Sequence, residues 1–171
     1  MGIFHSHTFN SLKDLFVSQL EDLYDAEQRL TTALPKMADA ATSPELKQAF
    51  MRHLNQTNRH VSRLEGIFQS LGIAPKRETC HAMKGLISEG SEMIDADGDP
   101  MVKDAALIAA AQRVEHYEMA GYGTVRAFAN HLGLPEAART LQETLDEEAD
   151  TDKTLTDLAE TGINAHALGS V

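Results

Sequence analysis

The stretch "LIAAAQRVEHYEMAGYGTVRAFANHL", residues 107–132, decides the fold of this chain of 171 residues. Its apolar residues recur at alternating spacings of four and three, which is the period of one face of an α-helix. Three further segments carry the same pattern, and none alternates over a similar length as a β-strand does. The four apolar stripes consist of Phe16, Leu20, Leu23, Leu30, Leu34, Met37 and Ala41; Phe50, Leu54, Val61, Leu64, Phe68 and Leu71; Leu107, Ala111, Val114, Gly121, Val125, Phe128 and Leu132; and Leu141, Leu145, Leu155 and Ala159. We therefore predict an all-α protein with helices over about residues 11–41, 44–71, 101–131 and 135–160.

The connections between these segments predict how the helices pair. The first and second helices, and the third and fourth, are joined by short links that favour antiparallel hairpins. Residues 72–100 form a long crossover with a short amphipathic segment that carries Cys80, Met83, Leu86, Ile87 and Met93. Two hairpins joined by one long crossover are typical of ferritin-like four-helix bundles. The sequence thus predicts a single ferritin-like domain over residues 1–171, with short tails at both ends.

The two predicted hairpins match in sequence register, which indicates an internal duplication. A shift of 91 residues places Glu27 on Glu118 and Pro44 on Pro135 (118 − 27 and 135 − 44). Each of these prolines opens its helix at the first position, where the missing N–H costs no hydrogen bond. The two halves are expected to be related by a pseudo-two-fold axis. Pro35 lies inside the first helix, where it is expected to produce a kink.

The composition excludes some classes of partner. Fifteen Lys and Arg stand against 26 Asp and Glu, a formal net charge of −11, so phosphate backbones and anionic membrane surfaces should repel the chain. No signal peptide or apolar stretch of transmembrane length is present. The single cysteine, Cys80, excludes an internal disulfide and fits a reducing compartment. His5 and His7 form a pair that is more typical of a solvated tail than of a metal site. These features predict a soluble cytoplasmic protein with no nucleic-acid or membrane partner.

Acidic residues interrupt the apolar stripes near their centres. Glu27 breaks the first stripe, Glu118 the third, and Glu148 followed by Asp152 the fourth, while Thr57 stands at the matching place in the second. A carboxylate at a core position costs several kcal/mol unless it is protonated or has a positive partner. Lys and Arg are absent from the stripes at this level, so a divalent or trivalent metal ion is the economical partner. For any one of these residues, a slightly shifted register that lets the carboxylate reach solvent is the alternative.

Neighbouring side chains add candidate ligands. Glu115 lies three residues before Glu118 and shares its face, and on the second helix Gln56 and His60 are four apart. His53 is interpreted as orienting a ligand or as a surface residue, and His60 alone could equally be a satisfied half-buried histidine. Carboxylates with one imidazole favour iron or manganese, and zinc also fits such a set. The predicted ligands, around two metal ions, are Glu27, Gln56, His60, Glu115, Glu118, Glu148 and Asp152.

Side chains beside the stripes are given other roles. His116 and Glu147 are interpreted as solvated, with His116 at the edge of the site. Tyr24, Tyr117 and Tyr122 fall near the level of the acidic residues by helical spacing. Core packing is their expected role, and a hydrogen bond to a metal ligand is the second.

Several strings of the sequence are similar to a known family. The strings "LYDAEQRL", "HLNQTNRHVSRLE", "KDAALIAAAQRVEHYE" and "TLDEEADTDKTLTDLA" resemble the YciE/YciF family of bacterial stress-associated ferritin-like proteins, over nearly the whole chain. The resemblance implies a four-helix bundle akin to rubrerythrin, with a two-metal centre and a tendency to dimerise. It also implies that Glu27, Glu115, Glu118 and Glu148 are bridging or terminal ligands, with Gln56 and His60 from the second helix. Gln56 is neutral where the family pattern can carry Glu, which lowers the charge of the ligand set and weakens a site for trivalent iron.

Two functions follow as hypotheses. The first is a stress-associated protein with two iron or manganese ions that performs redox chemistry with oxygen or peroxide. The chain has no flavin or rubredoxin-like cysteine motif, so its electron donor would be external. The second is a non-catalytic dimeric stress protein with a structural or vestigial metal site, which acts through partners. Iron storage in a shell ranks below both because the resemblance points to a homodimer. The sequence is compatible with both an enzyme and a non-catalytic protein.

Overall fold

The computed structural model describes residues 8–169, and every regular element in this range is helical. Four helices form the bundle: α1 (Leu12–Ala40), α2 (Pro44–Ser70), α4 (Pro100–His131) and α5 (Pro135–Leu158). The crossover carries α3 (His81–Asp95), and a π-helical turn, η1 (Ala159–Ile163), and α6 (Asn164–Ala167) follow α5. The predicted pair His5 and His7 lies outside the described residues. No helix between residues 8 and 169 combines the length and the apolar character needed to cross a membrane.

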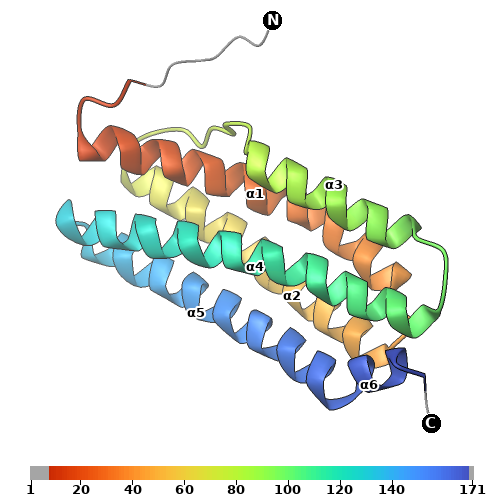
Figure 1. The fold of residues 1–171 in the computed structure, drawn as a ribbon. Helices are drawn as coiled ribbons and strands as arrows, with labels where there is room; N and C mark the ends of the chain where they lie inside the picture. Colours follow the sequence, from red (N-terminus) through yellow and green to blue (C-terminus); the bar gives the residue numbers. More distant parts are fainter. Residues whose placement is uncertain (1–7, 170–171) are drawn as a thin grey trace, which may run out of the picture.

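The helices are arranged as two hairpins that pack side by side (Figure 1). Within the hairpins α1 packs against α2 and α4 against α5, and the hairpins meet where α1 contacts α4 and α2 contacts α5. The crossover helix α3 lies on the outside of the bundle, against α1 and α4. Four helices therefore enclose the core, and a fifth covers the line along which α1 and α4 meet.

The helix ends follow the local chemistry of the sequence. Ser43 Oγ accepts a hydrogen bond from the backbone N–H of Leu46 at 3.2 Å, and Pro44 takes the first position of α2. Gly133, with φ of +69°, supplies the left-handed residue after α4. The helix α1 continues through Pro35 as a single element, so the lost backbone hydrogen bond does not end it.

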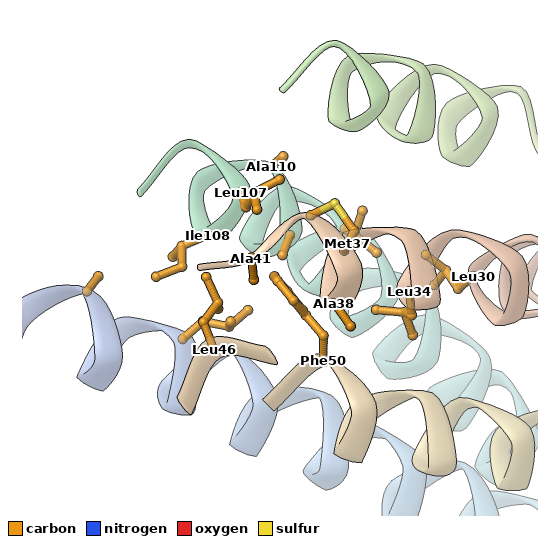
Figure 2. Close-up of a cluster of buried hydrophobic side chains, with 14 of the residues drawn as sticks. Leu30, Leu34, Met37, Ala38, Ala41, Leu46, Phe50, Leu107, Ile108 and Ala110 are labelled. Atoms are coloured by element: carbon orange, nitrogen blue, oxygen red, sulfur yellow. The ribbon is translucent and has the colours of Figure 1, made fainter. Parts of the chain in front are cut away.

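The apolar core is divided into two clusters along the bundle. One cluster lies near the turn between α1 and α2 and includes Leu34, Phe50 and Leu107 (Figure 2). The other contains Phe16 and Phe68, among other residues of all four bundle helices. Polar side chains occupy the level between the clusters, and this division positions the site described below.

A buried carboxylate from α4 fixes the turn between α1 and α2. Asp104 is fully buried and accepts the backbone N–H of Thr42 at 2.8 Å and of Ser43 at 2.6 Å. We expect Asp104→Ala to lower the free energy of unfolding by about 2–3 kcal/mol, because two charged hydrogen bonds disappear and two backbone donors lose their partner. Urea denaturation would measure the change. The control is Asp39→Ala, which removes an exposed carboxylate from α1. Equal stability of the two variants would contradict this role of Asp104.

Candidate metal centre

The level between the two apolar clusters is a polar layer that receives side chains from all four bundle helices. Each of these side chains belongs to a residue that is at most 2% exposed. The layer consists of Glu27 from α1, His53, Thr57 and His60 from α2, Glu115 and Glu118 from α4, and Glu148 from α5. The helical period that buries the apolar stripes also buries these residues, since they occupy stripe positions.

Two groups of potential metal ligands lie within the layer. The first contains His53, Glu115, Glu118 and Glu148, and the second contains Glu27, His60 and Glu148. In each group the ligand atoms lie within 4.8 Å of one another. Glu148 is common to both groups, so its carboxylate stands between them. Each of the two adjoining groups could hold a metal ion.

The imidazole nitrogens of the layer lie close to its carboxylate oxygens. His53 Nε2 lies 3.4 Å from Glu115 Oε1 and 3.7 Å from Glu148 Oε2. His60 Nδ1 lies 2.9 Å from Glu148 Oε1 and 3.2 Å from Glu27 Oε1. Imidazole nitrogens from α2 thus lie close to carboxylate oxygens from α1, α4 and α5.

Buried polar atoms that lack a hydrogen-bond partner are concentrated in this layer. In the part of the chain that the structure describes, ten buried side-chain nitrogen or oxygen atoms lack such a partner, and nine of them belong to the layer. They include both carboxylate oxygens of Glu118 and both of Glu148. Each such atom costs about 1–3 kcal/mol, and more when it is charged. Oxygen donors with imidazole nitrogens suit iron or manganese, so the residues present fit a cation that would satisfy these atoms.

Without a cation the layer cannot hold all of its carboxylates ionised. Burial raises the pKa of Glu27 to about 7, and the Glu148 carboxylate adds to that shift. Burial also raises the pKa of Glu115 and of Glu118 well above the ordinary range, with repulsion from the neighbouring carboxylates as a further cause. Metal ions must displace these protons, so binding is expected to strengthen as the pH rises.

His60 supplies positive charge to the layer when no cation is bound. Burial by itself would lower the pKa of this imidazole, but the carboxylates of Glu148 and Glu27 raise the pKa of His60 to about 10. Although burial raises the pKa of Glu148, the hydrogen bond and charge of His60 hold it below its ordinary value. Burial lowers the pKa of His53, which favours the neutral form that binds a metal.

Glu147 holds the other side of the His60 ring. Its Oε2 lies 2.7 Å from His60 Nε2 and 2.9 Å from Arg63 Nη1. Partial burial raises the pKa of Glu147, but Arg63 and His60 outweigh burial and lower it to about 2. The side chain is 25% exposed, so the interpretation of Glu147 as a solvated residue missed its contacts between α2 and α5. A carboxylate at this nitrogen fixes the orientation of a ligating imidazole.

Loss of this contact is expected to weaken metal binding without removing a ligand. We expect Glu147→Gln to lower the affinity for Mn(II) by about 10-fold to 100-fold, because His60 loses the charged partner that orients it. Competition with a chelating dye would measure the affinity. The matched control is Glu143→Gln, one turn earlier on α5, where the carboxylate is 66% exposed. The same affinity in both variants would show that Glu147 has no part in orienting the ligand.

Two predicted ligands lie outside the buried polar layer. Gln56 is partly exposed and lines a surface hollow between α2 and α5. The carboxylate of Asp152 accepts a hydrogen bond from Gln112 Nε2 at 3.1 Å and lies 3.3 Å from His116 Nε2. Asp152 lies one turn after Glu148 on α5, and its side chain is at the edge of the bundle. The structure thus places Gln56 and Asp152 outside the buried layer, and their membership of the ligand set stays a prediction.

His53 belongs to the first ligand group, although it is not among the ligands predicted from the sequence. The sequence suggests an orienting or surface residue, whereas in the structure His53 is 2% exposed and lies in the first group. Its spacing of seven residues from His60 is two helical turns, which puts both imidazoles on one face of α2. That spacing was the available signal.

Comparisons with known proteins identify the family and the fold. The family model described as "Domain of unknown function (DUF892)" matches residues 11–168. The protein YciF of Escherichia coli (strain K12) is 46% identical over 158 residues, which are 92% of this chain and 95% of YciF. The crystal structure of this E. coli stress protein matches with a TM-score of 0.88 and covers 91% of this chain and 99% of that one.

Two further solved structures bear on the fold. YcfI from Rhodopseudomonas palustris is 41% identical, with a TM-score of 0.85 over 90% of this chain and 98% of that one. A two-domain protein from Anabaena variabilis with DJ-1/ThiJ/PfpI-like and ferritin-like domains is 17% identical, with a TM-score of 0.60 over 95% of this chain and 39% of that one. This last likeness shows the fold alone. The predicted resemblance to YciF proteins and the predicted all-α ferritin-like bundle are both confirmed.

Proposed function

The chain belongs to the family described as the domain of unknown function DUF892, and from this premise we propose that its polar layer holds two iron or manganese ions for redox chemistry with oxygen or peroxide under stress. The observation that carries the proposal is the convergence of four buried glutamates and two buried histidines on two adjoining points. Nine unpartnered polar atoms at the same place support it. A cation would satisfy them, whereas without one the layer relies on protons, held by His60 and by the glutamates whose pKa burial raises.

The proposal assigns each ion to one group of ligands. His53, Glu115, Glu118 and Glu148 would hold one ion, and Glu27, His60 and Glu148 would hold the other. Glu148 would bridge the two. Zinc fits a set of carboxylates and imidazoles as well, but it has no redox chemistry of its own.

Iron or manganese bound here would supply one-electron chemistry toward oxygen or peroxide. The part of the chain is to exclude bulk water and to hold the ligands in place. Every ligand side chain belongs to a residue at most 2% exposed. The hydroxyl of Tyr122, itself fully buried, donates to Glu27 Oε1 at 2.5 Å, and Glu147 fixes the ring of His60. Both contacts limit how far a ligand can move when the charge of the site changes.

We further propose that the protein is a cytoplasmic homodimer whose reducing equivalents come from a separate donor. The only cysteine, Cys80, is buried and its Sγ lies 3.0 Å from the hydroxyl of Tyr117, so the chain has no pair of thiols to relay electrons. Size exclusion with light scattering would test the dimer, and a monomer mass would contradict it.

A second candidate is a non-catalytic stress protein in which the layer is structural or vestigial. The observation that favours it is the position of His60 between Glu148 and Glu27. A protonated imidazole there partly neutralises the layer, so the fold can tolerate the absence of a cation. In this case the protein would act through partners.

One experiment separates the two candidates. Protein purified without tags or chelators is loaded anaerobically with Fe(II), desalted and mixed with hydrogen peroxide in the presence of ascorbate. Peroxide consumption over many turnovers is then followed with an electrode. The control is Glu118→Ala, which removes a ligand with two unpartnered oxygens, and a second control is Glu143→Ala, which removes an exposed carboxylate.

The two candidates predict different rates of peroxide consumption. The redox proposal predicts consumption at least tenfold faster in the wild type and in Glu143→Ala than in Glu118→Ala. Equal rates in all three proteins would reject the redox function. Stoichiometric metal together with equal rates would leave the non-catalytic candidate.

A further inference from the structure

A cavity of about 370 Å³ lies between α1, α3 and α4, on the outer side of the bundle. Its apolar wall comes from all three helices and includes Leu34 and Met37 of α1, Leu86 and Ile87 of α3, and Ala111 and Val114 of α4. The volume falls within the range of small-molecule sites, about 300–1,000 Å³. The helix α3, which packs against both α1 and α4, contributes one side of this cavity.

Positive side chains line this cavity in a chain that is strongly acidic overall. Arg29, Lys36, Arg77 and Lys84 are four of the 15 Lys and Arg of the sequence, and all four line it. The one carboxylate among the lining residues is Glu115. The local charge is thus opposite in sign to the net charge of −11.

A buried carboxylate fixes two of these positive side chains. Asp25, 2% exposed, lies 2.5 Å from Arg29 Nε and 2.9 Å from Arg77 Nη2. Its Oδ2 also accepts the backbone N–H of Cys80 at 2.9 Å, which ties the start of α3 to α1. Asp25 neutralises only one of the two guanidinium charges, and Lys36 and Lys84 are exposed, so the lining keeps a positive excess.

We propose that this cavity binds a small amphipathic anion, a carboxylate with an apolar chain. The apolar wall would take the chain, and the exposed Lys36 and Lys84, which Asp25 does not pair, would hold the carboxylate at the mouth. A cationic or neutral amphiphile would gain the same apolar contact without the charge interaction. Glu115 lines the cavity and also belongs to the first ligand group, so the anion would lie beside the polar layer. The inference does not depend on the proposed metal or its redox chemistry.

Decanoate is a suitable probe because it combines one carboxylate with a linear apolar chain. Titration calorimetry of the full chain, below the micelle concentration, would compare decanoate with decyltrimethylammonium and decanol. Light scattering under the same conditions would record the oligomeric state. In heteronuclear NMR spectra the amide of Gly90 and the methyl groups of Ile87 and Ala110, which line the cavity, should shift with decanoate.

Three variants make the test specific. Lys36→Gln with Lys84→Gln removes two charges from the mouth, and Lys13→Gln with Lys47→Gln removes two exposed charges elsewhere. Ser91→Trp places a bulky side chain at an exposed lining position of α3. We expect a loss of decanoate affinity of at least tenfold in the first double variant and in Ser91→Trp, and less than twofold in the second double variant.

Several results would overturn the proposal. Equal binding of decyltrimethylammonium would show apolar adsorption without selection for an anion. Decanoate affinity that is unchanged in Ser91→Trp would place the ligand elsewhere. Absence of binding in a dimer that Ser91→Trp dissociates would assign the cavity to a second copy of the chain.

Discussion

Replacing Glu148 by alanine is expected to reduce the metal content of the reconstituted protein from about two ions to about none. Glu148 is the one residue common to both ligand groups, so its loss removes a ligand from each. Replacing His53 or Glu27, which belong to one group each, is expected to leave about one ion. The measurement is inductively coupled plasma mass spectrometry after loading with Mn(II) and desalting.

The chain offers a matched control on the same helix. Asp152 lies four residues after Glu148, and its carboxylate contacts Gln112 and His116 outside the layer. Asp152→Ala should therefore retain about two ions. Circular dichroism would establish that each variant is folded. Two ions retained by folded Glu148→Ala, or equal losses in Asp152→Ala, would refute the assignment of the two groups.

The metal-free protein is expected to lose about 2–3 kcal/mol of unfolding free energy between pH 6.5 and pH 8.5. The main cause is His60, whose pKa rises from 6.5 to about 10 on folding because the carboxylates of Glu148 and Glu27 outweigh its burial. Above pH 6.5 the unfolded chain releases this proton while the folded chain keeps it, so stability falls as the pH rises.

The other titratable groups of the layer either lower the stability as the pH rises, as His60 does, or have no effect on it between pH 6.5 and pH 8.5. Burial raises the pKa of Glu27 from 4.5 to about 7, so its destabilising effect develops between about pH 4.5 and pH 7 and is complete above that range. Burial also raises the pKa of Glu115 and of Glu118 well above the ordinary range, so both act in the same direction as His60. His53 has a lowered pKa and therefore affects stability only below pH 6.5. None of these contributions opposes the loss expected from His60.

Thermal unfolding followed by circular dichroism would measure the effect. In the presence of a chelator, the midpoint should drop by about 5–10 °C between pH 6.5 and pH 8.5. Saturating Mn(II) under anaerobic conditions should remove or reverse the drop, because the ions replace the protons of the layer. His60→Asn should flatten it in the metal-free protein. A midpoint that rises with pH in the chelator would contradict the protonated state inferred for His60.

The helices were predictable from the sequence because helical periodicity is a local property. Apolar spacing placed four long helices, and two short links with one long crossover gave their connectivity. The acidic interruptions of the stripes at Glu27, Glu118 and Glu148 pointed to the level at which polar side chains meet. Burial of these residues follows from their stripe positions, so the structure was expected to place them in the core.

Residues at the edges of the stripes could not be assigned in this way. A side chain at a stripe edge points into the core or out of it according to the rotation of its helix and the offset of its neighbours. His53 points inward and Asp152 lies at the edge of the bundle, the reverse of what their positions relative to the stripes predict. The contact of Glu147 with His60 likewise depends on the offset between α2 and α5.

The sequence by itself determined the helical class, the pairing of the helices and the central acidic residues, since each depends on spacing along one chain. The tertiary structure alone decided that His53 joins His60 beside those acids, and that a cavity with a positive lining lies between α1, α3 and α4. The physical reason is that a ligand group or a cavity depends on distances between atoms of different helices. Those distances are set by how all the helices pack together, which no single segment specifies.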